Sequence, residues 1–350
     1  MTKLDKEEIM AVRFKKSIRE SKLLDPTIGF TERVIKFEFR FDPLTRKRAR
    51  IMDLKFKVPA SPDLKELVDM SLRYPCPFCE ANLEKMTPKF VPRLIPEGRV
   101  RLDGAVVLPN FMPYGQNNAV VIFSPDHFLG LTQFSEEILA NGFLAAQSFF
   151  KKVYKKNAKN KYFSINWNYM PPSGASLVHP HLHLMADRDP SDYHDLVLKR
   201  GKRFWKKFQV NYWADLIKEE KRFEERFLGE TGAVSWLLYF APKGMMFDIM
   251  SIFVNKLSLL EISSGEFHDF ARGLQKIFLY LDKNNLISFN LTIFSGLKEK
   301  DYFWTHARIT PRFVIPPMNT SDVNFTGLFH DESLSIIKPE DVCQEMKAFF

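Results

Sequence analysis

The chain has 350 residues, of which 45% are hydrophobic, so it is long enough for one large or two ordinary globular domains. Lys and Arg outnumber Asp and Glu by 51 to 42, and this net charge of +9 suits a phosphorylated ligand. Because the basic clusters are separate along the chain, we expect no nucleic-acid partner. The charged N-terminus lacks an apolar signal core and no run of about 18 apolar residues occurs, so we expect a cytoplasmic protein without membrane contact.

Cysteine usage indicates metal or redox chemistry. Two of the three cysteines form the motif Cys76-Pro-Phe-Cys79, and Cys343 stands alone near the C-terminus. In a cytosolic chain, such a close pair is typical of a metal site or of a redox pair. The flanking Pro75 and Pro77 favour a tight knuckle, so we favour metal binding over the redox interpretation.

The N-terminal part of the chain predicts a helix, a hairpin and a second helix. Residues 5–23 have the pattern of a charged amphipathic helix. Alternation of apolar and charged residues predicts strands over 35–41 and 52–57, and the turn former Asp42-Pro43 between them predicts that they pair. Pro62 favours a short helix from about residue 61 to 72.

The next segment leads up to a histidine-rich stretch. Two apolar runs, 100–109 and 119–123, predict strands, and the loop 110–118 between them is rich in turn formers. Ser135 with two glutamates after it predicts a helix over 135–156. Residues 162–168 form the next predicted strand.

The second half of the chain repeats this order. Residues 191–228 are charged and predict a connecting helical segment. Beyond it, the pattern predicts strands over 234–240, 248–254, 287–294 and 303–309, and a helix over 265–283. We therefore expect two structurally similar halves, 1–190 with the site and 191–350 as a degenerate copy.

Three histidines share one face of a predicted strand. His179, His181 and His183 alternate with aliphatic residues such as Leu182 and Leu184, so a strand would place the imidazoles on one side and apolar side chains on the other. Imidazoles in a row suit metal binding and chemistry at phosphorus. The alternative is a half-exposed strand that happens to be rich in histidine.

The loop before this strand carries groups that can donate hydrogen bonds to a phosphate. Asn168, Ser173, Gly174 and Ser176 offer amide, hydroxyl and backbone N–H donors without extra charge. The alternative is a plain turn, for which Pro171-Pro-Ser-Gly174 would be sufficient.

Four residues could complete a zinc site. Zinc takes about four sulfur or nitrogen ligands in a tetrahedron. Cys76 and Cys79 supply two, His127 lies just past a predicted strand, and His179 is the natural fourth ligand.

The neighbouring His181 is then a candidate nucleophile. A neutral imidazole can attack phosphorus and form a phosphoramidate that a second acceptor displaces. His183 could bond a phosphate oxygen or donate a proton to the leaving group, or it could simply support the strand.

These motifs resemble the galactose-1-phosphate uridylyltransferase family, a branch of the histidine-triad superfamily. The resemblance is carried by Asn168, Gly174-Ala-Ser176 and His179-Pro-His181, and it extends more loosely to Asp42-Pro-Leu-Thr45 and Phe303-Trp-Thr-His306. It implies zinc at Cys76, Cys79, His127 and His179, a nucleotidylated His181 assisted by Ser176, and a nucleoside held by Asn110 and Phe111.

Three features depart from that family. His183 stands where the family has Gln, which is the pattern of the histidine-triad hydrolases. His306-Ala-Arg308 replaces a metal-binding His-x-His pair, so we expect no second metal. The arginines that follow the family's early Asp-Pro-Leu-Thr motif are not clearly present.

The resemblance implies an α+β fold of two histidine-triad-like halves, each an antiparallel sheet with helices packed on one side. It implies a nucleotidyltransferase of galactose metabolism that moves a nucleoside monophosphate from a nucleotide sugar to a sugar phosphate or phosphate, and a homodimer. Because of His183, a histidine-triad nucleotide hydrolase or a dinucleotide or nucleotide-sugar phosphorylase is the alternative. A third hypothesis is a zinc-stabilised binder of nucleotides or RNA, supported by the net charge alone.

Overall fold

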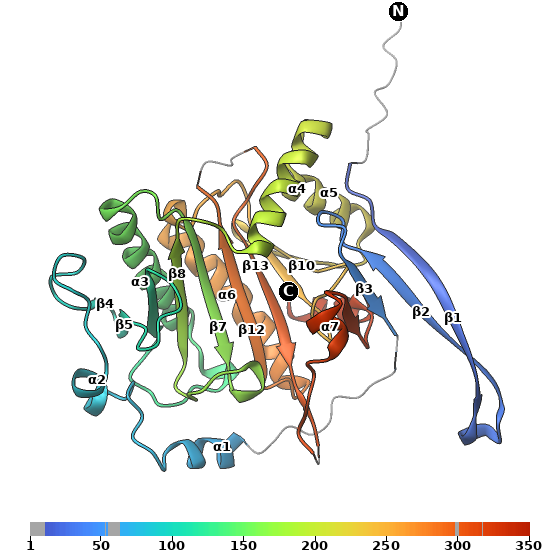
Figure 1. Ribbon diagram of the computed structural model, residues 1–350, viewed down its shortest axis with the longest axis horizontal. Helices are drawn as coiled ribbons and strands as arrows, with labels where there is room; N and C mark the ends of the chain where they lie inside the picture. The colour runs from blue at the N-terminus through green and yellow to red at the C-terminus, as the bar shows by residue number, and fades with distance from the viewer. Residues whose placement is uncertain (1–10, 53, 55–63, 298–300, 317) are drawn as a thin grey trace, which may run out of the picture.

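One ten-stranded antiparallel sheet organises the structure, a computed structural model that describes residues 11–52, 54, 64–297, 301–316 and 318–350 (Figure 1). Helices pack on this sheet, and a smaller four-stranded sheet lies beside it. The predicted α+β class is confirmed. The two halves, however, share one continuous sheet, and the division at residue 190 stays a prediction.

The strand order of the large sheet is duplicated. From each outer edge inward, the strands run in the order first, second, third, fifth and fourth, and the two fourth strands pair antiparallel at the centre of the sheet. In the first half these are β4 (Val100–Leu102), β5 (Ala105–Pro109), β6 (Asn118–Ile122), β8 (His181–Asp187) and β7 (Tyr162–Tyr169). In the second half they are β9 (Phe227–Thr231), β10 (Val234–Leu238), β11 (Ile249–Phe253), β13 (His306–Arg312) and β12 (Ser288–Ser295).

Two long helices cover one face of the sheet. These are α3 (Glu136–Lys156) and α6 (Ser264–Lys283) (Figure 1). In the sequence, each follows the third strand of its half and precedes the fourth. Ser135 caps α3, and Ser263 caps α6 in a capping box. Their buried faces join the sheet's inward side chains in the main hydrophobic core.

The opposite face is covered differently in the two halves. The helices α4 (Asp192–Phe208) and α5 (Tyr212–Phe223) pack on the second half, where Trp213 belongs to the same separate core cluster as Tyr239 and Ile252. Helices therefore cover the second half on both faces, whereas we expected them on one side only. On the first half, the side chains of Asn168 and His183 on this face are half-buried.

The small sheet is tied to the body by a buried ion network. It consists of β1 (Lys15–Asp25), β2 (Thr31–Phe41), β3 (Arg48–Ile51) and β16 (Ser333–Ser335), and the β1–β2 hairpin extends away from the body (Figure 1). Arg40 on β2 donates two hydrogen bonds of 2.8 Å to Glu340 on α8 (Pro339–Met346). Arg226 donates a third, also of 2.8 Å, to the same carboxylate.

The helix predicted over residues 5–23 is wrong where the structure describes it. β1 is a strand that pairs with β2 over its full length. The charged residues whose spacing had indicated a helix form ion pairs across the two strands instead. These pairs are Lys36 with Glu20 and Lys22 with Glu32. Residues 5–10 lie outside the described residues.

Most other predicted elements are present with shifted ends. The hairpin partner begins earlier, as β3, and most of residues 52–57 lie outside the described residues. The segment 191–228 is helical as expected but ends in strand β9, which we did not predict. The remaining elements are α1 (Leu64–Ser71), α2 (Glu80–Met86), β14 (Val314–Ile315), β15 (Thr320–Ser321) and α7 (Phe325–Phe329). A helix with the length and apolarity needed to cross a bilayer is not found within the described ranges.

Candidate active site and metal cluster

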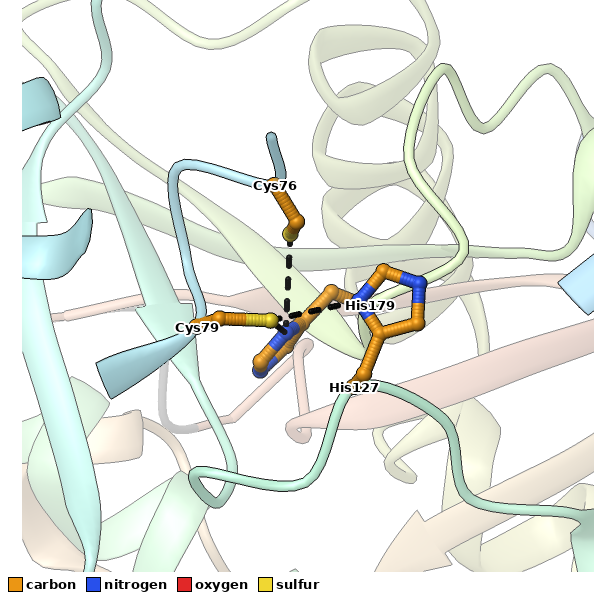
Figure 2. Close-up of side chains that lie close together, drawn as sticks. All are labelled: Cys76, Cys79, His127 and His179. Carbon is orange, nitrogen blue, oxygen red and sulfur yellow. Dashed lines mark hydrogen bonds between the residues drawn. The ribbon is translucent and has the colours of Figure 1, made fainter. Parts of the chain in front are cut away.

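Residues from three segments converge to form a cluster that could hold a metal ion (Figure 2). Cys76 and Cys79 lie in the turn that leads into α2, His127 follows β6, and His179 directly precedes β8. Their ligand atoms all lie within 4.8 Å of one another. The four residues predicted to bind zinc are therefore brought together.

The spacing of the cluster suits a tetrahedral ion. The Cys79 Sγ atom lies 3.3 Å from His127 Nδ1, and His179 Nδ1 lies 3.7 Å from Cys76 Sγ and 3.8 Å from Cys79 Sγ. Bonds of about 2.0–2.3 Å to zinc, arranged tetrahedrally, separate the ligand atoms by about 3.5 Å. The donor set and its spacing thus fit zinc.

Both histidines are oriented by the nitrogen that faces away from the cluster. His179 Nε2 lies 3.0 Å from the carbonyl oxygen of Ser124, which can only accept, so the proton is on Nε2. The Ser71 hydroxyl donates to the carbonyl of Val68 at 2.7 Å and therefore accepts from His127 Nε2 at 2.8 Å. In both rings Nδ1 is left unprotonated toward the cluster, as a metal ligand requires.

Cys79 does not have the character of a redox-active cysteine. Burial, together with the neighbouring Cys76, raises the pKa of the Cys79 thiol to about 11. A reactive cysteine needs a lowered pKa, because the thiolate is the nucleophile. The Cys79 thiol therefore lacks the lowered pKa of a reactive redox cysteine.

His181 has a defined tautomer on the first residue of β8. Its Nδ1 atom lies 2.8 Å from the carbonyl oxygen of His179, so Nδ1 carries the proton and Nε2 keeps its lone pair. Burial, followed by the neighbouring His183, lowers the pKa of His181 to about 4. The imidazole is therefore neutral at pH 7, and Phe78 lies beside it with ring centroids 5.2 Å apart.

His183 lies next to His181 on the same face, with ring centroids 4.9 Å apart. Its Nδ1 atom is buried and has no hydrogen-bond partner within the described part of the chain. Tyr114 of the 110–118 loop approaches this ring to 6.5 Å between centroids. Among the described residues, no group fixes the tautomer of His183, in contrast to His179 and His181.

The loop between β7 and β8 turns tightly at Gly174. This residue has a φ of +91°, and its N–H donates to the carbonyl of Pro171 at 2.8 Å. The Ser173 hydroxyl donates to the carbonyl oxygens of Tyr169 and Met170, so it holds the loop rather than pointing to a ligand. Ser176 is exposed, and Asn168 lies half-buried on the same face of the sheet as His183.

The 110–118 loop borders the site from the edge of the sheet. Asn110 Nδ2 donates to Asn118 Oδ1 at 2.8 Å, and Asn118 donates in turn to the carbonyl of Leu184 on β8. Phe111 is 80% exposed, so it is available to a ligand. The loop is thus anchored to the histidine strand, as a nucleoside-binding role would require.

Several residues of the site were not predicted. Phe78 lies within the cysteine motif, so its contact with His181 could have been suspected from the sequence. Ser71 and Asn290 carry no such signal, because their roles depend on contacts with His127 and Asn168 from distant segments.

The second half holds a closed counterpart of this site. His306 begins β13 as His181 begins β8, and its Nδ1 likewise bonds a carbonyl oxygen, that of Trp304, at 2.9 Å. Its ring is stacked on Trp213 of α5 with centroids 4.0 Å apart. Arg308 forms a buried ion pair with Asp248. The corresponding face is therefore filled by packing here, whereas Asn168 and His183 of the first half are only half-buried.

Comparison with known proteins identifies a full-length relative and similar folds. No protein-family model matches the chain. An uncharacterized protein of Archaeoglobus fulgidus is 31% identical over 339 residues, which are 96% of this chain and 98% of the relative.

Two solved structures share the fold at low identity. An ADP-glucose phosphorylase of Arabidopsis thaliana with bound ADP-glucose superposes with a TM-score of 0.70 at 18% identity, covering 89% of this chain and 98% of that one. A uridylyltransferase gives a TM-score of 0.65 at 16% identity, covering 89% and 97%. The chain therefore belongs to one family with the archaeal protein, and it shares its fold with the ADP-glucose phosphorylase and the uridylyltransferase.

Proposed function

We propose that the chain transfers a nucleoside monophosphate from a nucleotide sugar to a sugar phosphate or to phosphate through a covalent adduct on His181. The observation that carries this proposal is the hydrogen bond of 2.8 Å between His181 Nδ1 and the His179 carbonyl, which leaves Nε2 unprotonated. The solved structures with this fold include a phosphorylase of a nucleotide sugar and a uridylyltransferase.

The reaction proceeds in two displacements. The Nε2 lone pair of His181 attacks the α-phosphorus, an N–P bond forms, and the P–O bond to the sugar phosphate breaks with its electron pair leaving on that oxygen. An oxygen of the acceptor then attacks the same phosphorus, and the electron pair of the N–P bond returns to Nε2. The His179 carbonyl accepts from Nδ1–H throughout and stabilises the positive charge on the ring.

The remaining residues of the site have supporting roles in this proposal. Asn168 and the exposed Ser176 donate to phosphate oxygens, and Asn110 and Phe111 border the nucleoside. Ser173 and Gly174 shape the loop, because their backbone N–H groups donate to the carbonyl oxygens of Met170 and Pro171. His183, whose tautomer is free, exchanges a proton with the leaving or entering oxygen.

We propose zinc for the cluster of Cys76, Cys79, His127 and His179, since the donors and their spacing fit that ion. The ion would supply a rigid cross-link between the cysteine turn and the start of β8. His179 would then hold its own carbonyl in place against His181.

We also propose a homodimer in the cytoplasm. The support, besides the family resemblance, is a set of exposed apolar side chains in the 110–118 loop and in α7 and the segment before it. These are Phe111, Met112, Tyr114, Val323, Phe325, Leu328 and Phe329. Light scattering coupled to size exclusion tests the dimer, and a monomeric mass at micromolar concentration would contradict it.

Intact-mass spectrometry tests the covalent step. The protein is mixed with ADP-glucose, UDP-glucose or UDP-galactose and quenched in base, and one of them should add a nucleoside monophosphate to the wild type and not to His181→Ala. His330→Ala is the matched control, because His330 is exposed at the C-terminal end of α7 and should label normally. Absence of the adduct with every nucleotide sugar would overturn the proposal.

The second candidate is a nucleotide hydrolase, which the free tautomer of His183 favours because it can activate water. The same experiment separates the two candidates. Loss of the adduct only on addition of phosphate or a sugar phosphate supports transfer. Release of nucleoside monophosphate into water without an acceptor supports hydrolysis.

A further inference from the structure

Asn290 on β12 connects the second half of the chain to the catalytic loop. It lies opposite Asn168 where β7 and β12 pair at the centre of the sheet. Its Nδ2 atom donates to Asn168 Oδ1 at 2.8 Å and to the carbonyl oxygen of Ser173 at 2.9 Å. Its Oδ1 atom accepts from Arg312 Nη1 at 2.8 Å. Asn290 on β12 therefore connects the end of β7 and the loop after it with β13.

The direction of these hydrogen bonds is fixed by chemistry. A guanidinium can only donate and a carbonyl oxygen can only accept, so the Asn290 amide has one allowed orientation between Arg312 and Ser173. Its second N–H then points at Asn168, which must present its oxygen. The amide nitrogen of Asn168 has no acceptor in the residues that the structure describes, so it is free to donate to a ligand.

We call the hydrogen-bonded series from Arg312 through Asn290 to Asn168 the relay. Its arginine is fixed by an ion pair. Arg312 Nε donates to Asp322 Oδ2 at 2.7 Å, and a second contact joins the same two side chains. The Asp322 side chain is 2% exposed, so this is a shielded pair. Arg312, Asn290 and Asp322 all line a cavity of about 380 Å³, which makes the relay accessible from that side.

We propose that Asn290, held by Arg312 and Asp322, is a positioning residue that makes Asn168 present its N–H groups, and not its oxygen, to the α-phosphate. This inference rests on the proposed function and deepens it, because a residue of the second half then decides which end of the Asn168 amide faces the phosphate. If Asn168 rotated, its carbonyl oxygen would face the phosphate oxygens and repel them.

The variant Asn290→Asp tests the relay with little change in shape. A carboxylate keeps the contact with Arg312 but can donate neither to Asn168 nor to the Ser173 carbonyl, so Asn168 rotates to donate toward the new carboxylate. The rate of adduct formation on His181 should fall about ten- to hundredfold, as expected for a lost hydrogen bond to a charged oxygen. Ser288→Ala is the matched control, because Ser288 on the same strand bonds the loop at the Tyr169 carbonyl at 2.7 Å without touching Asn168.

A double-mutant cycle separates positioning from simple structural support. If Asn290 acts through Asn168, then Asn290→Asp should cost nothing further in an Asn168→Ala background. Additive losses, an unchanged rate in Asn290→Asp, or an equal loss in Ser288→Ala would each overturn the proposal. Should Asn290→Asp not fold, Asn290→Ala takes its place in the same cycle.

Nucleotide affinity distinguishes failure of the relay from failure of the proposed function. If the wild type forms no adduct, the proposed reaction fails, and the cycle is repeated with the dissociation constants of AMP and UMP. Weaker binding in Asn290→Asp that disappears in the Asn168→Ala background still supports the relay. If the wild type binds neither nucleotide, both proposals fall.

Discussion

Ser71→Ala should weaken metal binding although Ser71 is not a ligand. Its hydroxyl accepts from His127 Nε2 at 2.8 Å while donating to the Val68 carbonyl at 2.7 Å, so it fixes both the tautomer and the ring plane of His127. Loss of such a partner typically costs about 10- to 100-fold in metal affinity, equivalent to about 1.4–2.7 kcal/mol. The hydrogen bond from His127 to Ser71 is the contact that we describe between α1 and the cluster.

Competition for zinc against a chelator of known affinity measures this effect at neutral pH. The control is Ser263→Ala, which removes the N-cap of α6 far from the cluster and costs about 1 kcal/mol of stability. The control should lower the melting temperature of the protein and leave its zinc affinity unchanged. Ser71→Ala should instead lower the zinc affinity. A zinc affinity of Ser71→Ala within twofold of the wild type would refute the reasoning.

Three further outcomes are expected. Removing zinc with a chelator should lower the melting temperature and slow covalent labelling of His181, because the cluster holds the carbonyl that orients this ring. Burial alone would raise the pKa of Glu340, but its two arginine partners hold it at about 2, below the ordinary 4.5, so its stabilisation is complete above about pH 4.5 and is lost as pH falls toward 2. Glu340→Gln should therefore lower the urea-unfolding free energy by about 3 kcal/mol at pH 7 and by much less at pH 3. Gly142→Ala would bring a methyl group within 2.5 Å of the Phe123 ring and should cost about 1–3 kcal/mol, whereas Gly265→Ala, with open space around it, should be neutral or stabilising in the same thermal assay.

The sequence was sufficient for elements whose signals are local. Ser135 with the glutamates that follow it begins α3 as predicted, because an N-cap and a favourable helix dipole act within one turn. The alternation of histidines with leucines predicted the two faces of β8, where Leu182 and Leu184 are fully buried. The four metal-cluster residues were found because cysteine and histidine are few in this chain.

Features that depend on distant partners could not be predicted from local patterns. The charges of residues 15–25 fit a helix as well as a strand, and only pairing with residues 31–41 decides between them. The role of Ser173 was assigned to phosphate because a serine beside a glycine is typical of anion loops, but its hydroxyl is engaged by backbone carbonyls. Asn290 gave no signal, since its three partners come from other segments.

The two halves share a strand order but differ in the layer that covers the histidine-bearing face of the sheet. Both halves place a histidine at the start of the fifth strand with its Nδ1 bonded to a carbonyl two residues earlier, so the backbone supplies the same orientation twice. What differs is the layer above the sheet. Trp213 of the connecting helices stacks on His306, and burial lowers the pKa of His306 to about 3, so this ring is neutral like His181 but shielded from any phosphate. The connecting helices thus cover the counterpart of His181 in the second half. The contact of the second half with the proposed site is the hydrogen bond from Asn290 to Asn168.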